Sequence, residues 1–117
     1  MTPEGVVKQL LKDFLLDHNI YPASKAVAFP DDAQGWYFMP VPTGYGTAGV
    51  HDFIGHYKGR FFSIETKAPG RRGQKFRGCS PHQEHQKNAI NKSGALALVV
   101  DGVEDLEIFE TWMEGVE

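Results

Sequence analysis

Asp52, Glu65 and Lys67 are the residues whose types and spacing are best suited to chemistry. They flank the dipeptide Lys58-Gly59, which joins two apolar-rich runs and predicts a β-hairpin, because glycine supplies the positive φ of a tight turn. If this dipeptide forms the loop, Asp52 lies directly opposite Glu65. Residues paired in this way point to the same face of the sheet, with Cβ atoms about 4.5–5.5 Å apart. Lys67 shares that face because it lies two residues beyond Glu65.

Two carboxylates held this close repel each other unless something neutralises them. A hard divalent cation does so and prefers oxygen ligands. The alternative is an ordinary solvated strand, since a Glu-x-Lys pattern is common on such a face. A slip of one residue or a β-bulge would also turn Asp52 away from Glu65. The register that pairs Tyr57 with Arg60 therefore carries the prediction of a metal-dependent site.

Length and composition predict one globular domain spanning residues 1–117. Hydrophobic residues make up 41% and charged residues 23% of the chain, which is typical of a folded domain and not of a disordered one. Cys79 is the only cysteine, so no intrachain disulfide can form, as is usual in a reducing compartment. No apolar run approaches membrane-spanning length, and the N-terminus lacks a signal pattern. We expect a soluble, cytoplasmic protein with no membrane partner.

The charges are unevenly distributed along the chain. The net charge of −3 argues against nucleic acid, but nine of the twelve basic residues fall between Lys58 and Lys92. Seven acidic residues and no basic ones lie between Asp101 and Glu117. This asymmetry predicts a basic working face and a solvated acidic end, with an unpartnered charge run as the alternative.

A loop rich in glycine and cations, residues 68–78, follows Lys67 directly. Its proline and three glycines predict no regular structure. Basic side chains on such a loop give phosphate contacts that do not depend on sequence. We therefore expect four residues to grip a DNA backbone: Arg71, Arg72, Lys75 and Arg77.

Local signals predict alternating helices and strands. Thr2-Pro3 starts a helix that ends near Asp17 or His18, and Ser80-Pro81 starts a second helix that ends near Gly94. Strands are predicted at residues 26–29, 36–41 and 95–100, in addition to the two strands of the hairpin. Residues 106–113 fit either a helix face or a short strand. A helix followed by a buried strand is typical of an α/β layer.

Two other groups of residues suggest different functions. The glycine-rich segment from Thr43 to Gly49 lacks the Lys-Ser/Thr ending of a phosphate-binding loop, so it predicts a flexible connector, with base stacking by Tyr45 as a minor alternative. Cys79, His82 and His85 have zinc-ligand chemistry, but their spacing matches no common zinc motif. A nucleophilic role for Cys79 would need an organised histidine partner.

Four segments occur in an order that resembles a known family. They are G-x-x-D from Gly49, I-E-T-K-A-P-G from Ile64, S-P-x-Q from Ser80, and the apolar strand after Gly94. Together they resemble the VRR-NUC family, a branch of the PD-(D/E)XK nuclease superfamily, and in particular its small stand-alone phage and bacterial members. The resemblance covers nearly the whole chain and is strongest between Tyr45 and Val100.

The resemblance implies a restriction-endonuclease-like fold and a nuclease function. The expected core is α-β-β-β-α-β, a mixed sheet flanked by helices. The expected activity is metal-dependent hydrolysis of phosphodiester bonds in branched or structured DNA, similar to Holliday-junction resolvases. The implied cofactor is Mg²⁺, with Mn²⁺ as an alternative. The implied assembly is a homodimer in the cytoplasm of a bacterium or a phage-infected host cell.

The resemblance also implies roles for individual residues. Asp52, Glu65 and the backbone carbonyl of Thr66 match the family's metal ligands, and Lys67 matches the residue that positions or activates the attacking water. Two supporting residues are implied as well, Gln83 on the second helix and Glu4 on the first.

The chain departs from the family pattern at three places. The proline of the family's P-D signature is His51 here. Gln86 lies one turn from Gln83 and is an alternative for its role. The loop from Gly70 to Gly78 is longer than usual in the family.

Two functions other than a nuclease fit the sequence. One is a non-catalytic DNA-binding module that uses the basic loop. The other is a small zinc-supported interaction protein. The intact set of Asp52, Glu65 and Lys67 favours the nuclease over the binding module.

Overall fold

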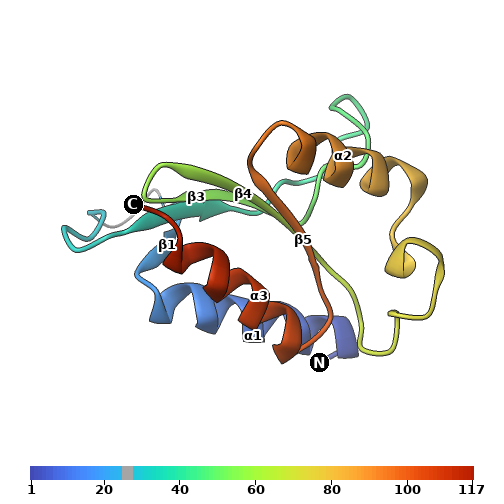
Figure 1. Cartoon of the computed structure of the whole chain (residues 1–117), viewed down its shortest axis with the longest axis horizontal. Coiled ribbons are helices and arrows are strands. Elements are labelled where there is room, and N and C mark those ends of the chain that lie inside the picture. The colour runs from blue at the N-terminus through green and yellow to red at the C-terminus, as the bar shows by residue number, and fades with distance from the viewer. Residues whose placement is uncertain (25–27) are drawn as a thin grey trace.

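The computed structural model describes residues 1–24 and 28–117 and has an α/β architecture (Figure 1). Its five strands form one mixed sheet in the order β1-β2-β3-β4-β5, in which the two outer pairs are parallel and the two inner pairs are antiparallel. The elements are α1 (Pro3–Asp17), β1 (Ile20–Pro22), β2 (Gly35–Phe38), β3 (Phe53–Tyr57), β4 (Arg60–Thr66), the 3₁₀ turn η1 (Lys75–Gly78), α2 (Pro81–Lys92), β5 (Leu96–Val100) and α3 (Val103–Glu114). The predicted class, a mixed sheet flanked by helices, is confirmed.

The helices cover the two faces of the sheet unequally. α1 and α3 lie side by side on one face, and α2 crosses the other (Figure 1). The main core lies on the α1 and α3 side, where Leu11 and Phe109 pack against Phe62 and Ile64 of β4. α1 starts as predicted, because the hydroxyl of Thr2 accepts a hydrogen bond from the backbone N–H of Gly5. Within the described residues, no helix has both the length and the apolar character needed to cross a membrane.

The hairpin between β3 and β4 has the predicted turn and register. Lys58 and Gly59 have φ values of 49° and 81°, as a type I′ turn requires, and Tyr57 pairs with Arg60. The last pair of the ladder is Phe53 with Ile64. Asp52 therefore lies one residue before β3, outside the regular alternation of faces.

Several predicted boundaries differ from the observed ones. β2 ends at Phe38 and not at residue 41, because Pro40 and Pro42 cannot donate ladder hydrogen bonds. Residues 26 and 27 of the strand predicted at 26–29 lie outside the described part of the chain, and residues 28 and 29 are not in a strand. No local pattern predicted β1, which is too short to show periodicity. Residues 106–113 form a helix within α3.

The prediction of a solvated acidic end is wrong for the start of this segment. Asp105 is fully buried and Asp101 is 6% exposed. Arg72 and Arg77 pair with Asp105 at 2.8 and 3.1 Å. The physical reason is that a buried carboxylate needs a partner charge, and the basic loop supplies it.

These ion pairs fasten the loop between β4 and α2 to the start of α3. The loop was predicted to lack regular structure, yet it contains the single turn η1. Phe76 and Arg77 have φ values of 53° and 55° in this turn, so it does not continue into a regular helix.

Candidate active site

Glu65 is the centre of a polar cluster at the C-terminal end of β4. Its side chain is almost fully buried, with the residue 2% exposed. Oε1 accepts a hydrogen bond from the backbone N–H of Asp52 at 3.2 Å. Oε2 accepts one from the Gln83 amide at 2.7 Å and lies 3.2 Å from Nζ of Lys67. One carboxylate therefore joins the residue before β3, the end of β4 and the first turn of α2.

Asp52 approaches the same strand end from the side of α1. Its Oδ2 accepts hydrogen bonds from the backbone N–H and the hydroxyl of Thr66, at 3.1 and 2.6 Å. The same oxygen lies 3.7 Å from Nζ of Lys8 on α1. The sequence predicted that Asp52 and Glu65 would point to one face as a directly opposed pair. Instead, the Asp52 carboxylate contacts α1 and the Glu65 carboxylate contacts α2, because Asp52 lies beyond the end of the ladder.

The environment of Glu65 disfavours its charged form. Burial raises the pKa of Glu65 to about 7, and the negative charge of Asp52 acts in the same direction. The ammonium group of Lys67 opposes this shift without cancelling it. Near pH 7 the Glu65 carboxyl is therefore only partly ionised.

Gln83 is held so that its amide nitrogen must face Glu65. Its Oε1 accepts hydrogen bonds from the backbone N–H of Ser80 at 2.9 Å and from Nζ of Lys67 at 3.2 Å. Ser80 in turn caps α2 by accepting from the backbone N–H of Gln83, which completes a capping box. Gln86 points elsewhere and donates to the backbone carbonyl of Ala48 at 3.3 Å. Of the two glutamines considered, Gln83 is the one that touches the cluster.

His51 is buried, with 1% exposed. Its Nε2 lies 2.9 Å from the backbone carbonyl of Gln83, and its Nδ1 lies 2.7 Å from Oγ of Ser63. A carbonyl only accepts, so Nε2 carries the proton in this contact, and a neutral ring then accepts from the Ser63 hydroxyl. His51 thus ties the first turn of α2 to β4, a role that its sequence position did not reveal.

Lys8 is a second residue that the sequence analysis missed. Its Nζ pairs with Oε2 of Glu4 at 3.3 Å as well as with Asp52. Burial opposes the charge on Lys8, but Asp52 and Glu4 outweigh it and raise the pKa of Lys8. Glu4 therefore reaches the cluster through Lys8. The available signal was the Glu4-x-x-x-Lys8 spacing beside the buried stripe of α1.

The donor atoms of the cluster suit a hard divalent cation. Asp52, Glu65 and the backbone carbonyl of Thr66 offer oxygen ligands only, which Mg²⁺ prefers. In residues 1–24 and 28–117, no group of three or more His, Cys, Asp or Glu side chains is arranged to hold a metal ion. Mg²⁺ commonly takes one or two carboxylates and completes its shell with water and substrate phosphate. The residues present fit such an ion.

In the described part of the chain, Cys79, His82 and His85 form no group that could hold a zinc ion. Cys79 is buried, whereas His82 and His85 are exposed on α2. Burial raises the pKa of the Cys79 thiol, which disfavours the reactive thiolate.

The four predicted DNA-contacting residues divide into two pairs. Arg72 and Arg77 are committed to the carboxylates of Asp101 and Asp105. Arg71 and Lys75 have no carboxylate partner among the described residues; Arg71 donates to Gln74, and Lys75 lies over the ring of Phe76. Only the second pair is free to meet phosphates.

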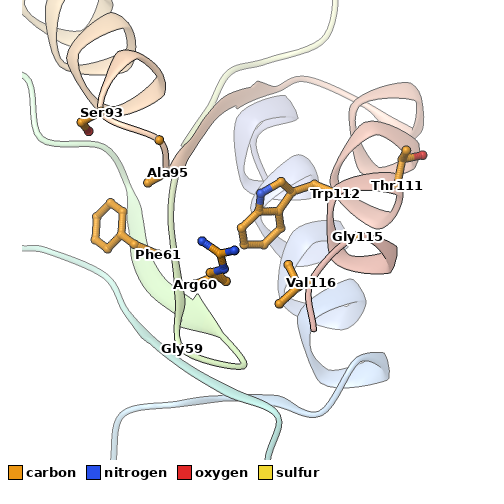
Figure 2. A pocket seen from close by; sticks show the side chains of 10 residues that line it. Gly59, Arg60, Phe61, Ser93, Ala95, Thr111, Trp112, Gly115 and Val116 are labelled. Carbon is orange, nitrogen blue, oxygen red and sulfur yellow. The ribbon is translucent and has the colours of Figure 1, made fainter.

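Two cavities lie at opposite ends of β4. A groove of about 540 Å³ adjoins the cluster and is partly lined by Asp52 and Gln83. A second cavity of about 560 Å³ lies at the other end, where the side chains of Arg60 and Trp112 point into it (Figure 2). The second cavity contains none of the predicted site residues.

Comparisons of the chain with protein-family models, with curated proteins and with solved structures found no match.

Proposed function

We propose that the protein is a metal-dependent DNA endonuclease of the VRR-NUC type. The single observation that carries the proposal is the environment of Glu65, whose buried carboxylate contacts Lys67, Gln83 and the backbone of Asp52. These are the residues that the resemblance implies for a nuclease site. The order α1-β2-β3-β4-α2-β5 also supports the restriction-endonuclease-like core, with β1 and α3 as additions.

Each residue of the cluster has a role in this proposal. Asp52, Glu65 and the carbonyl of Thr66 would hold Mg²⁺ or Mn²⁺. A bound ion would lower the pKa of a coordinated water and would neutralise charge on the phosphate. Lys67 holds a fixed positive charge next to Glu65, where it orients the attacking water and favours its deprotonated form.

The remaining residues of the cluster position the metal ligands and Lys67. Gln83 fixes both Glu65 and Lys67 through its two amide atoms, so the carboxylate and the amine keep one relative geometry. Glu4 and Lys8 hold Asp52 from the side of α1. Such preorganisation accounts for a large part of the rate enhancement in many hydrolytic sites.

The proposed substrate is branched or structured DNA, cut by a homodimer. Arg71 and Lys75 are the loop cations available to phosphates, while Arg72 and Arg77 hold the loop in place. In the part of the chain that the structure describes, no base-reading helix or ribbon is evident, so DNA shape is the basis of selection in this proposal.

The test is cleavage of supercoiled plasmid and of a four-way junction in Mg²⁺. Asp52→Asn and Glu65→Gln should each reduce cleavage at least about a hundredfold, as expected when several kcal/mol of transition-state stabilisation are lost. Asp13→Asn, at an exposed position on α1, is the matched control and should cut normally. If wild type binds both DNAs and cuts neither, the protein is a DNA-binding module and the nuclease proposal is wrong.

A further inference from the structure

The groove beside the candidate active site lies between the loop after β2 and the first turn of α2. Asp52 and Gln83 are among its lining residues, so it adjoins the cluster where a bound phosphate would lie. Its volume of about 540 Å³ lies within the range of roughly 300–1,000 Å³ typical of small-ligand sites. The position and size suit one nucleoside next to the phosphate being cut.

The lining of the groove is poor in charge. Its walls include Pro40, Val41, Pro42 and Val50, and among the described residues no lysine or arginine lines it. The loop cations that suit phosphates belong to a different segment of the chain. Such a lining, which contains no cation from the described residues, favours a neutral group over a phosphate, and a nucleobase is a flat, neutral group.

The glycine-rich segment that lines the groove packs directly against α2 at Ala48 and Gly49. Gly49 has a φ of 81°, and a Cβ on it would lie 2.3 Å from the backbone of His82. Next to it, the Ala48 carbonyl accepts a hydrogen bond from Gln86 at 3.3 Å. This end of the segment therefore has a defined position. The same segment carries Tyr45, which is 97% exposed.

We propose that this groove binds an unpaired nucleobase of the DNA strand that is cut, an inference that rests on the proposed function. A base in a duplex is paired and stacked, so it must be extruded from the stack before it can enter, which costs free energy. Strands with unpaired nucleotides avoid that cost. Tyr45 stacks on the adjacent base, because an exposed aromatic ring offers a face to any base. The groove thereby selects DNA that is single-stranded next to the cut.

The experiment compares single-stranded and duplex DNA by fluorescence anisotropy, with Ca²⁺ in place of Mg²⁺. The probes are a labelled thymidine oligonucleotide and its duplex with the complementary strand. Thr47→Trp places an indole in the groove. The matched control is Thr111→Trp, which adds the same side chain at an exposed threonine lining the opposite cavity (Figure 2).

Wild type should bind the single strand about tenfold more tightly than the duplex, since stacking of one base is worth this much or more. Thr47→Trp should lose this preference without weakening duplex binding, and Thr111→Trp should keep it. Equal binding of the two DNAs by wild type, or an equal loss for both DNAs in Thr47→Trp, overturns the inference while Mg²⁺-dependent cleavage still supports the nuclease. If no DNA is bound or cut, the proposed function and this inference are both wrong.

Discussion

Lys8 Nζ lies 3.7 Å from Oδ2 of Asp52, although the two residues are on α1 and just before β3. Lys67 Nζ lies 3.2 Å from Oε2 of Glu65 in the same cluster. Each carboxylate of the candidate metal site therefore has its own lysine, supplied from a different element. A lysine ammonium and a divalent cation are attracted to the same carboxylate oxygens, so the two compete.

Removing this competition at Asp52 should increase affinity for a divalent cation. We expect Lys8→Met to bind Ca²⁺ about two- to fivefold more tightly than wild type, the range that a partly exposed ion pair supports. Isothermal titration calorimetry without DNA measures this directly. Lys12→Met, one turn further along α1, is the matched control and should bind as wild type does. Weaker Ca²⁺ binding by Lys8→Met would mean that the orienting effect of Lys8 on Asp52 outweighs its competition with the cation.

The raised pKa of Glu65 predicts how stability depends on pH in EDTA. Between pH 4.5 and about 7 the folded protein keeps a proton that the unfolded chain has released. The free energy of unfolding therefore falls as pH rises through this window, by up to about 1.4 kcal/mol per pH unit, and levels off above it. Glu65→Gln cannot titrate, so it should lack this fall.

Urea unfolding of both proteins at pH 5 and pH 8 measures the difference. Wild type should lose on the order of 2–3 kcal/mol more than Glu65→Gln between these two values. Glu114→Gln, at an exposed glutamate on α3, should follow wild type. Parallel pH profiles for wild type and Glu65→Gln would show that Glu65 titrates normally in the folded protein.

The two pairs of loop cations should have separable effects. Arg77→Met leaves the buried carboxylates of Asp101 and Asp105 underpaired, so it should lower the free energy of unfolding by about 2–4 kcal/mol. Arg71→Met and Lys75→Met should change stability by less than about 0.5 kcal/mol.

The effects on DNA binding should be reversed, with binding weakened by substitution of Arg71 or Lys75 and not by substitution of Arg77. Arg71→Met and Lys75→Met should each weaken binding of every DNA tested, and each should lower the slope of log affinity against log salt by about one. Anisotropy titrations at several salt concentrations, alongside urea unfolding, measure both quantities. A stable Arg77→Met variant that has lost DNA binding would instead make Arg77 a phosphate contact.

The sequence predicted local features of the site well and long-range ones poorly. The Lys58-Gly59 turn and the register that pairs Tyr57 with Arg60 follow from local glycine and alternation signals. The orientation of Asp52 did not follow, because strand alternation stops at Phe53 and a contact with Lys8 then decides where the side chain lies.

Other features depended on tertiary contacts that no local pattern reveals. Asp105 belongs to the acidic segment that starts at Asp101 and was expected in solvent, yet it is buried because Arg72 and Arg77 reach it across about thirty residues of sequence. His51 looked like a departure from a family motif, but its partners Ser63 and Gln83 are distant in sequence. In each case the burial of the side chain depends on a contact with residues distant in sequence, and no local pattern predicts that contact.

The side chain of Asn91 covers part of the outer edge of β5. β5 is an edge strand, and its residue Ala97 has both backbone groups bonded to the Asn91 amide, with N–H to Oδ1 at 2.8 Å and C=O to Nδ2 at 3.0 Å. Arg77 Nη1 donates to the carbonyl of Val99, the next outward residue, at 3.4 Å. Side chains thus occupy backbone groups that another strand would use.

Asn91→Ala should free both groups of Ala97 and open this edge. We expect the free energy of unfolding to fall by about 1–3 kcal/mol, the cost of unpaired buried polar groups, and the variant to self-associate as concentration rises. Asn88→Ala, on an exposed position of α2, should do neither. Urea unfolding and sedimentation velocity measure the two effects. Because Asn91 and Arg77 occupy the β5 edge in wild type, the proposed homodimer must use another surface, and a wild-type dimer that Asn91→Ala dissociates would contradict this assignment.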